Sequence, residues 1–322
     1  MPNIRINLLS DLHLECFRAD PEALDYRSLH ANPEDTDLYV LAGDIDDTGL
    51  TALSFLSYMN SLGKPVLYLL GNHEYYYCDG FGTLADRYRA AFNEQPGKYH
   101  NVKLLDDSGR DLHGHYVDLL GVRFVGATLW TDFNLLLKKP AASVQEKAEV
   151  LTNAKASMRD YMRIGKQVDV AMPLQTGTIS VARLEPQDIL TANARGRSNI
   201  YRTILASSLP TVVVTHHAPL MQSMAQAAHR ARQILTEQPD NQQAQRILRT
   251  EKHHAHLYCN DLTELLCQLA LQRKTPLAWL HGHLHATLDY NDAGVRVCCN
   301  AMGYYPHLNT DFVPSKIVHL SC

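Results

Sequence analysis

The sequence predicts an α/β fold, and three observations support this class. First, residues 38–42 form a short apolar run that ends at Gly43 and Asp44, a pattern typical of a strand buried on both faces. Second, residues 48–62 have helical apolar spacing and residues 66–70 form another apolar run, which together predict a βαβ unit. Third, five predicted strands are followed by side chains that can bind a metal. Open α/β sheets bind ligands beyond the carboxyl ends of their strands, so we expect a functional site there.

The same periodicities predict the remaining elements. Further strands are expected at residues 4–9, 102–105, 116–120, 122–126, 211–215, 277–280, 287–290, 295–299 and 316–320. Further helices are expected at residues 83–92, 220–251 and 261–273. The turn sequence at residues 291–294 predicts that the strands on either side of it form a hairpin. The His-His-Ala-His cluster at residues 253–256 has no strand before it, and we interpret it as an exposed loop rather than a metal site.

Residues 133–205 differ from the rest of the chain. Their pattern is helical with few long apolar runs, and they contain eleven Lys and Arg against six Asp and Glu. We interpret the chain as a single domain over residues 1–322, with this segment as a helical insertion lying over the core. Two hypotheses for the segment stay open. It is either a solvated excursion or a substrate-facing element in which Arg195 and Arg197 help to bind an anion.

Composition excludes several classes of protein. The chain has 322 residues, of which 45% are apolar and 20% are charged, and this is ordinary for a globular protein with a large core. The net charge of -4 argues against a partner made of long nucleic acid, although nucleotides remain candidates. No run reaches the ~18 apolar residues of a membrane span, so no membrane partner is expected. Seven cysteines without a Cys-x-x-Cys motif or a signal segment indicate a reducing, cytoplasmic environment.

Common catalytic motifs of other enzyme classes are missing from the sequence. No Gly-x-Gly-x-x-Gly follows a predicted strand, and no Gly-Lys-Ser/Thr occurs, which excludes a Rossmann dinucleotide site and a P-loop. Gly-x-Ser-x-Gly is absent, which argues against a serine hydrolase, and His-Glu-x-x-His is absent, which argues against a zincin.

Metal-capable side chains follow five of the predicted strands. They are Asp11 and His13, Asp44, Asn72 and His73, His216 and His217, and His283 and His285. Any single one could belong to a turn, but five on one chain are expected to converge at one edge of the sheet. In extended chain Asp11 and His13 would share a face. Carboxylate, amide oxygen and imidazole without thiolate suit Mn, Fe, Zn, Co or Ni. There are more ligands than one metal uses, which predicts two divalent transition-metal ions sharing a carboxylate, an arrangement used for attack at phosphorus.

Taken together, these motifs resemble those of a known superfamily. In order they are Asp-x-His at 11–13, Gly-Asp at 43–44, Gly-Asn-His-Glu at 71–74, His at 216 and Gly-His-x-His at 282–285. The set resembles the calcineurin-like metallophosphoesterases, and residues 128–132 and 300–304 also resemble bacterial members. The motifs span most of the chain, and no motif position departs from the pattern. The resemblance implies a four-layer α/β/β/α sandwich, in which two mixed β-sheets pack face to face with helices outside.

The resemblance also implies a role for each of these residues. One metal is held by Asp11, His13 and His285, the other by Asn72, His216 and His283, and Asp44 bridges the two. A hydroxide that bridges the metals is the nucleophile, and Asn72 and His73 contact the substrate.

The implied catalytic residues are His73 and Asp47. His73 is not a ligand; it orients the phosphate or protonates the leaving oxygen, with Asp47 as its carboxylate partner. Asp46 stays an alternative to Asp47. His217 stays an alternative to His216, which is favoured because it lies nearer the strand end.

The implied function is metal-dependent hydrolysis of phosphate monoesters or diesters of small molecules. Two alternatives are a non-catalytic scaffold that keeps the fold, and a nuclease or cyclic-nucleotide phosphodiesterase of the same superfamily. Lost ligands would mark a scaffold, and none is lost. The sequence does not indicate the oligomeric state.

Overall fold

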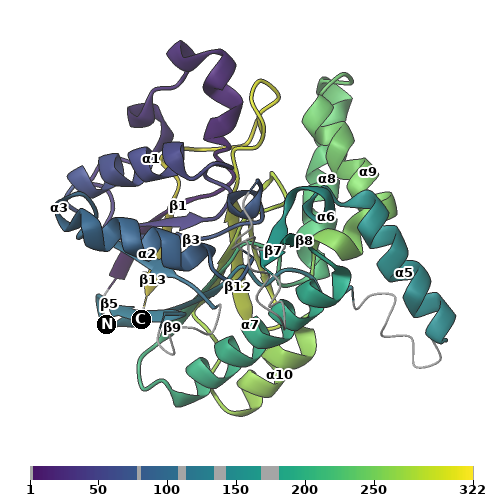
Figure 1. Ribbon diagram of the computed structural model, residues 1–322. Coiled ribbons are helices and arrows are strands. Elements are labelled where there is room, and N and C mark those ends of the chain that lie inside the picture. The colour runs from purple at the N-terminus through teal and green to yellow at the C-terminus, as the bar shows by residue number, and fades with distance from the viewer. Residues whose placement is uncertain (1–2, 78–80, 108–113, 134–142, 168–180, 322) are drawn as a thin grey trace, which may run out of the picture.

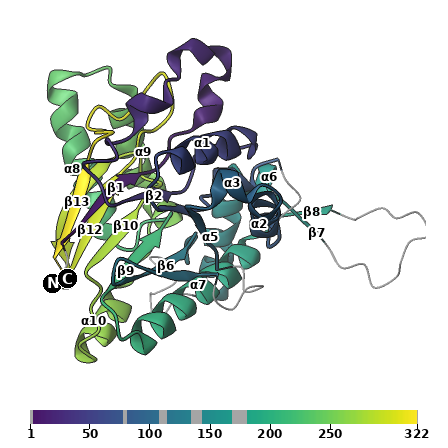
Figure 2. The same ribbon diagram turned by 90° about the vertical axis from the view of Figure 1, so that its left-hand side faces the viewer.

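In the computed structural model, two mixed β-sheets pack face to face and carry helices on their outer surfaces (Figure 1, Figure 2). The structure describes residues 3–77, 81–107, 114–133, 143–167 and 181–321. The α/β class and the four-layer arrangement predicted from the sequence are therefore confirmed.

The first sheet has five strands in the order β13-β1-β2-β3-β4. They are β1 (Asn3–Leu9), β2 (Leu38–Ala42), β3 (Val66–Leu69), β4 (Val102–Leu105) and β13 (Ile317–Ser321). Strands β1 to β4 are parallel, and β13 pairs antiparallel with β1. Helix α1 (Leu50–Ser61) connects β2 to β3 and completes the predicted βαβ unit. Every residue of β2 and β3 is buried, as the apolar runs predicted.

The second sheet has six strands in the order β11-β12-β10-β9-β6-β5. They are β5 (Tyr116–Leu119), β6 (Val122–Ala127), β9 (Thr211–Thr215), β10 (Ala278–His281), β11 (Thr287–Asp292) and β12 (Val295–Asn300). Strands β6, β9, β10 and β12 are parallel, whereas β5 and β11 run antiparallel at the two edges. Strands β11 and β12 form the predicted hairpin.

The sequence predicted that all the metal-capable strand ends would meet at one edge of a single sheet. In the structure these strand ends belong to two different sheets. Strands β1, β2 and β3 lie in the first sheet, and β9 and β10 lie in the second. A buried strand has the same apolar pattern in either sheet, so the sequence alone could not assign each strand to its sheet. The two sets still meet, because an apolar layer that includes Leu8, Val40, Val214 and Leu280 joins the sheets face to face.

Helices cover the outer face of the first sheet. They are α1, α2 (Leu84–Glu94) and α3 (Pro96–Tyr99). Phe55 and Met59 of α1 and Tyr88 of α2 belong to the same buried cluster as Tyr39 and Tyr68 of the strands. The apolar stripe of each helix thus meets the sheet face that points away from the second sheet.

Other helices cover the second sheet. Helices α7 (Pro186–Ala206) and α10 (Thr263–Leu271) pack on β9 and β10, with Ile200 and Leu266 buried beside Trp279. Helices α8 (Met221–Glu237) and α9 (Gln242–Tyr258) form a hairpin that packs beside β11 and β12 (Figure 1). Residues 253–256 lie within α9, so their interpretation as a loop was wrong. No Gly or Pro interrupts α9, and its helical spacing continues through the histidines.

The segment 133–205 contains α5 (Val144–Ser157), α6 (Asp160–Arg163), a small hairpin of β7 (Gly165–Gln167) and β8 (Val181–Arg183), and α7. Residues 134–142 and 168–180 of this segment lie outside the described part of the chain. Ala154 of α5 and Ile189 of α7 are buried in the cluster that contains α1 and α2. None of the described helices is both long and apolar enough to cross a membrane.

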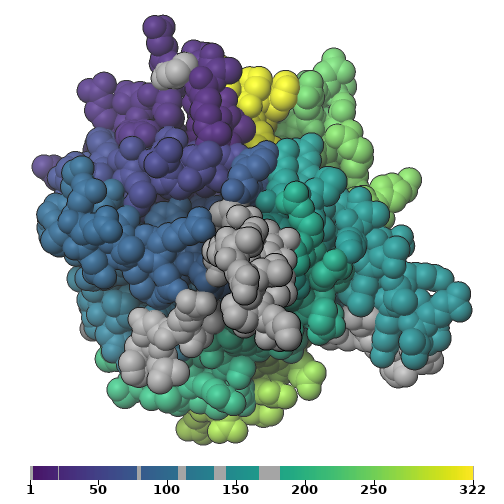
Figure 3. Space-filling view, in the orientation of Figure 1, coloured from purple at the N-terminus to yellow at the C-terminus, as the bar shows by residue number. Residues whose placement is uncertain are grey.

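The connection between β12 and β13, residues 301–316, lies between the N-terminal 3-10 helices and the α8–α9 hairpin (Figure 3). The hydroxyl of Tyr305 donates to Asp20 at 3.1 Å, and Arg230 of α8 donates to Asp311 at 2.7 Å. These contacts bring a C-terminal loop to the carboxyl ends of β1 and β10, where the predicted site lies.

Candidate metal centre

Five of the predicted ligands have a left-handed backbone conformation. Their φ values are 53° for Asp11, 45° for His13, 56° for Asp44, 69° for His283 and 47° for His285. This conformation is uncommon for residues other than glycine, costs on the order of 1 kcal/mol or more, and clusters at functional sites. Asp11 and His13 therefore reach the centre through a left-handed turn, and the extended chain assumed from their spacing was wrong.

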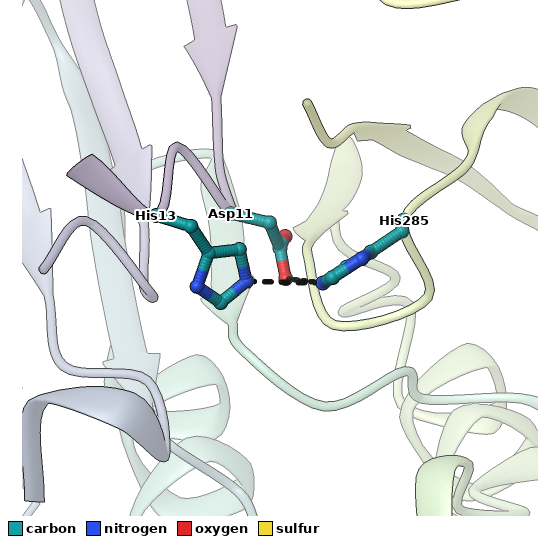
Figure 4. A group of neighbouring side chains, drawn as sticks. All are labelled: Asp11, His13 and His285. Carbon is teal, nitrogen blue, oxygen red and sulfur yellow. Dashed lines mark hydrogen bonds and ion pairs between the residues drawn. The ribbon is translucent and has the colours of Figure 1, made fainter. Parts of the chain in front are cut away.

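The first group of predicted ligands is Asp11, His13 and His285 (Figure 4). The Nε2 atoms of His13 and His285 lie 3.1 Å apart, and His285 Nε2 lies 3.3 Å from Asp11 Oδ1. All three side chains are buried, and Figure 4 shows them pointing toward one another from two separate loops. The backbone N–H of His283 donates to both Asp11 oxygens, at 3.1 and 2.9 Å, which ties the loop after β10 to the loop after β1.

The second group surrounds the Nε2 atom of His216. Asn72 Oδ1 lies 3.0 Å from it, His283 Nδ1 lies 3.1 Å from it and Asp44 Oδ2 lies 3.3 Å from it. His216 Nδ1 donates to the carbonyl oxygen of Ala42 at 2.9 Å, which fixes the ring. Asn72 Nδ2 donates to Asp160 Oδ1 at 2.9 Å, which turns the amide oxygen of Asn72 toward His216.

Asp44 stands between the two groups. Its Oδ2 atom lies 3.3 Å from His216 Nε2 and 3.8 Å from His13 Nε2, so one oxygen faces both. Its Oδ1 atom accepts the backbone N–H of His73 at 2.8 Å. Gly71 has to be a glycine for this approach, because a Cβ there would collide with Asp44 Oδ1 and lie 2.5 Å from the Asp44 nitrogen.

These separations fit the donor set of a metal centre. Two ligands bound at about 2.1 Å lie about 3.0 Å apart at a right angle and about 3.4 Å apart at a tetrahedral angle. Burial lowers the pKa of His285 to about 4, against its hydrogen bond with Asp11, and burial also lowers the pKa of His283. These two rings are therefore neutral, as a metal ligand must be. Paired ring nitrogens at 3.1 Å need a shared proton or a cation between them.

Glu74 stabilises the two loops that carry Asp44 and Asn72. Its carboxylate accepts the backbone N–H groups of Asp44, Ile45 and Gly71 at 3.0, 2.8 and 2.8 Å, and the Tyr68 hydroxyl at 3.0 Å. Burial and the negative charge of Asp44 raise the pKa of Glu74 to about 7. The sequence placed Glu74 in a motif without giving it a role.

His73 lies at the edge of the centre and faces Glu15 and Tyr304. His73 Nδ1 donates to Glu15 Oε1 at 3.2 Å, and His73 Nε2 lies 3.0 Å from the Tyr304 hydroxyl. His13 Nδ1 donates to the same Glu15 oxygen at 2.8 Å. Burial alone would lower the pKa of His73, but the negative charge of Asp44 and the hydrogen bond with Glu15 raise it. The residue begins a 3-10 turn (His73–Tyr75), so its divergence from Asn72 does not come from extended chain.

The expected pairing of His73 with Asp47 was wrong. Asp47 accepts a hydrogen bond from Arg18 at 2.6 Å, and Arg18 also donates to Asp46 at 3.1 Å. Both carboxylates therefore pair with Arg18, which the sequence did not place near them. The carboxylate beside His73 is Glu15, because the left-handed turn at His13 directs the following 3-10 helix (Leu14–Ala19) across the centre.

His217 has a different environment from its neighbour. Its Nδ1 donates to the Thr128 carbonyl at 3.2 Å, and its ring lies against those of His283 and Trp130. Burial and the neighbouring imidazole of His216 lower the pKa of His217 to about 3. Of the pair left open by the sequence, His216 is the residue whose ring nitrogen points at Asn72 and Asp44.

The sequence did not predict a functional role for Glu15, Tyr304 or Asp160. Glu15 continues the alternation of Asp11 and His13, and Tyr304 ends one of the stretches that resemble bacterial phosphoesterases, so both carried a signal. Asp160 carried none, because only the tertiary structure brings α6 to Asn72.

A cavity of about 380 Å³ opens beside the centre. Its lining includes Asp44, Asn72, His73, His283 and His285 of the centre, together with residues of α6 and α9. Arg195 and Arg197, which the insertion hypothesis placed over the substrate, do not line it. Arg195 donates to the Asp107 carbonyl at 2.6 Å and Arg197 to Asp132 at 3.0 Å, because α7 lies on the outer face of the second sheet.

The fold and the site together define a class of protein, a phosphoester hydrolase with His and Asp side chains arranged for divalent metal. The sequence matches the family described as calcineurin-like phosphoesterase over residues 4–170, and the chain belongs to that family. The family uses divalent metals, and the described residues contain groups suited to bind them.

A solved structure with a TM-score above 0.5 shares the fold at low sequence identity. A phosphopantetheinyl hydrolase from Mycobacterium tuberculosis is similar with a TM-score of 0.56 and 17% identity, and the alignment covers 94% of each chain. A dimetal phosphatase from Danio rerio gives a TM-score of 0.45 and 13% identity, over 99% of this chain and 98% of that chain. The comparison with curated proteins finds no match.

Proposed function

We propose that this protein hydrolyses phosphate monoesters or diesters of small molecules at a centre of two divalent transition-metal ions. One observation carries the proposal. Ligand atoms from five strand ends, in two sheets, lie 3.0 to 3.8 Å apart around one carboxylate, that of Asp44. Oxygen and imidazole donors without thiolate suit Mn, Fe or Zn, and also Co and Ni.

The residue roles follow from the two groups. Asp11, His13 and His285 bind one ion, Asn72, His216 and His283 bind the other, and Asp44 is shared. When bound, the two ions supply a water of lowered pKa and neutralise charge on the phosphoryl oxygens. The neighbouring hydrogen bonds of Asp160 and Glu74 hold the ligands in this arrangement, as outer partners do at other metal sites.

His73 is the residue that we assign to the substrate. In the hydrolysis a water oxygen bonds to phosphorus, the ester P–O bond breaks, and the leaving oxygen takes a proton. His73 lines the cavity, and its Nε2 is the atom that donates either that proton or a hydrogen bond to a phosphoryl oxygen. Glu15 fixes the ring through Nδ1, and we assign to it the orienting role that the sequence analysis gave to Asp47.

The alternative functions have less support. A scaffold would have no need of neutral, converging histidines on a strained backbone. A cavity of about 380 Å³ lies in the range of about 300–1,000 Å³ that small-molecule sites occupy. Together with the net charge of -4, this favours a small ester over long nucleic acid.

We also propose that residues 1–322 form one domain and that residues 133–205 elaborate it. In support, Val150 and Ala154 of α5 and Ile189 of α7 are buried in the cluster that covers the first sheet. Residues 157–160 of this segment line the cavity, so the segment borders the substrate.

Metal removal and reconstitution tests the proposal. We expect two metals per chain by elemental analysis, loss of hydrolysis of p-nitrophenyl phosphate or bis(p-nitrophenyl) phosphate on chelation, and recovery with a transition metal such as Mn. His253→Ala on the exposed side of α9 is a matched control that keeps two metals. At most one metal in a fully active sample contradicts the shared centre, and full activity without metal contradicts the proposed chemistry.

A further inference from the structure

The cavity has a second charged region besides the metal centre. Arg159, which precedes α6, and Arg246 and Arg249 of α9 all line it. Among the described residues, none of the three arginines has a carboxylate within ion-pair distance. Three other surface arginines contrast with them, since Arg5, Arg123 and Arg296 each pair with an aspartate at 2.7 to 2.9 Å.

Arg246 is the most constrained of the three. It is half-buried, its Cζ lies 4.5 Å above the ring of Tyr304, and its charge interacts with the side chains of Tyr304 and Tyr258. The positive charge of Arg246 is therefore partly desolvated, and the side chains around it are neutral. A desolvated cation of this kind is costly unless an anion pairs with it, and a guanidinium is well shaped to pair with phosphate or carboxylate.

The carboxylates of the cavity do not supply this anion. Asp44 is surrounded by the imidazoles of the centre, and Asp160 accepts from Asn72 at 2.9 Å. Tyr304 lies between the two regions, because Arg246 Cζ lies 4.5 Å from its ring and its hydroxyl lies 3.0 Å from His73 Nε2. A molecule that reached from the centre to the arginines would therefore pass Tyr304.

We propose that Arg159, Arg246 and Arg249 form a subsite for a second anionic group of the substrate. The substrate is then a small organic phosphate ester that carries a further phosphate or carboxylate. This inference rests on the proposed phosphoesterase function, because it places the scissile phosphate at the metal centre. The cavity of about 380 Å³ has room for both groups of such a molecule.

The test compares esters that differ only in their far end. Butane-1,4-diol monophosphate, 4-(phosphonooxy)butanoate and butane-1,4-diol bisphosphate carry a hydroxyl, a carboxylate and a phosphate there. They are assayed on the metal-reconstituted protein together with their methyl diesters and with three- and six-carbon analogues. We expect kcat/KM to be about ten- to hundred-fold higher for one or both anionic arms, mainly through KM and more so at low salt.

Substitutions of single arginines then test which residues cause the preference for an anionic arm. Arg246→Gln should reduce the preference for the anionic arm about tenfold or more, and Arg159→Gln and the exposed Arg249→Gln should reduce it less. Arg202→Gln, on the exposed side of α7, removes the same charge and should leave the preference unchanged. If Arg246→Gln does not fold, Arg249→Gln and the salt dependence still decide the question.

The outcomes separate the two proposals. Hydrolysis of the hydroxyl ester with no preference for either anionic arm overturns the subsite but leaves the phosphoesterase intact. An equal preference in Arg246→Gln, Arg249→Gln and the native protein also overturns it. No hydrolysis of any ester after metal reconstitution overturns the proposed function itself, and the subsite with it.

Discussion

Replacing Glu15 with glutamine tests how the histidines of the centre are oriented. One oxygen of Glu15 accepts from His13 Nδ1 at 2.8 Å and from His73 Nδ1 at 3.2 Å. These hydrogen bonds place both Nδ1 protons on the Glu15 side, so that His13 Nε2 faces His285 and His73 Nε2 faces the cavity. Glu15→Gln keeps the shape of the side chain but removes its charge.

The size of the effect follows from the two hydrogen bonds. A hydrogen bond with a charged partner contributes about 1.5–3 kcal/mol and a neutral one about 0.5–1.5 kcal/mol, so weakening both costs on the order of 2 kcal/mol. This corresponds to a loss of roughly 30-fold, within the 10- to 100-fold range of outer partners at metal sites. We expect this loss to consist partly of weaker metal binding at Asp11, His13 and His285, and partly of a lower kcat.

The assay measures metal affinity by competition with a chelator, and kcat and KM at saturating metal. Glu22→Gln is the matched control, because Glu22 is exposed and lies only seven residues further along the chain. If Glu15→Gln kept metal affinity and kcat/KM within twofold of the native values, the orienting role assigned to Glu15 would be wrong.

The same residue predicts a pH dependence. Burial would raise the pKa of Glu15, but its hydrogen bonds with His13 and His73 lower it from 4.5 to about 2. A depressed carboxyl pKa stabilises the fold above pH 4.5, and this stabilisation, roughly 3 kcal/mol, is lost as the pH falls toward 2. Urea unfolding of the metal-free protein should therefore show that the free energy of unfolding falls less between pH 4.5 and pH 2 in Glu15→Gln than in the native protein.

Three further substitutions address single roles. Asp44→Asn should lower metal occupancy at both sites and activity more than Asp11→Asn does; full occupancy with a near-normal rate would contradict the shared carboxylate. His73→Asn should keep two metals and reduce kcat for an alkyl ester by about 10²–10⁴-fold, but much less for a nitrophenyl ester that needs little protonation. Equal losses on both esters would point to phosphate orientation, and a lost metal would contradict its placement outside the ligands. Glu74→Ala should lower the free energy of unfolding by on the order of 3–6 kcal/mol, because three buried N–H groups lose their acceptor; an unchanged urea midpoint would exclude that stabilising role.

The sequence alone determined the class of the fold and the residue types of the site. Strand β2 and the turn after it could be predicted from a local apolar run and a Gly-Asp pair, since burial on both faces leaves a continuous pattern. The order of the metal-capable motifs predicted the family, because a ligand has to keep its chemistry whatever surrounds it. Most helices and strands were placed to within a few residues wherever one period dominated a segment. The helical stretch expected at residues 220–251 is instead two helices, α8 and α9, separated by residues 238–241.

Tertiary structure decided what depends on contacts between distant segments. The division of the strands between two sheets, the pairing of Glu15 with His73, and that of Arg18 with Asp47 involve no local pattern. The left-handed conformations at Asp11 and His13 are held by neighbouring loops and not by their own preferences. Arg246 is an ordinary helical residue in the sequence, and it reaches the cavity only because α9 packs beside Tyr304. Local free energies decide which elements form, whereas burial and electrostatics between elements decide which side chains meet.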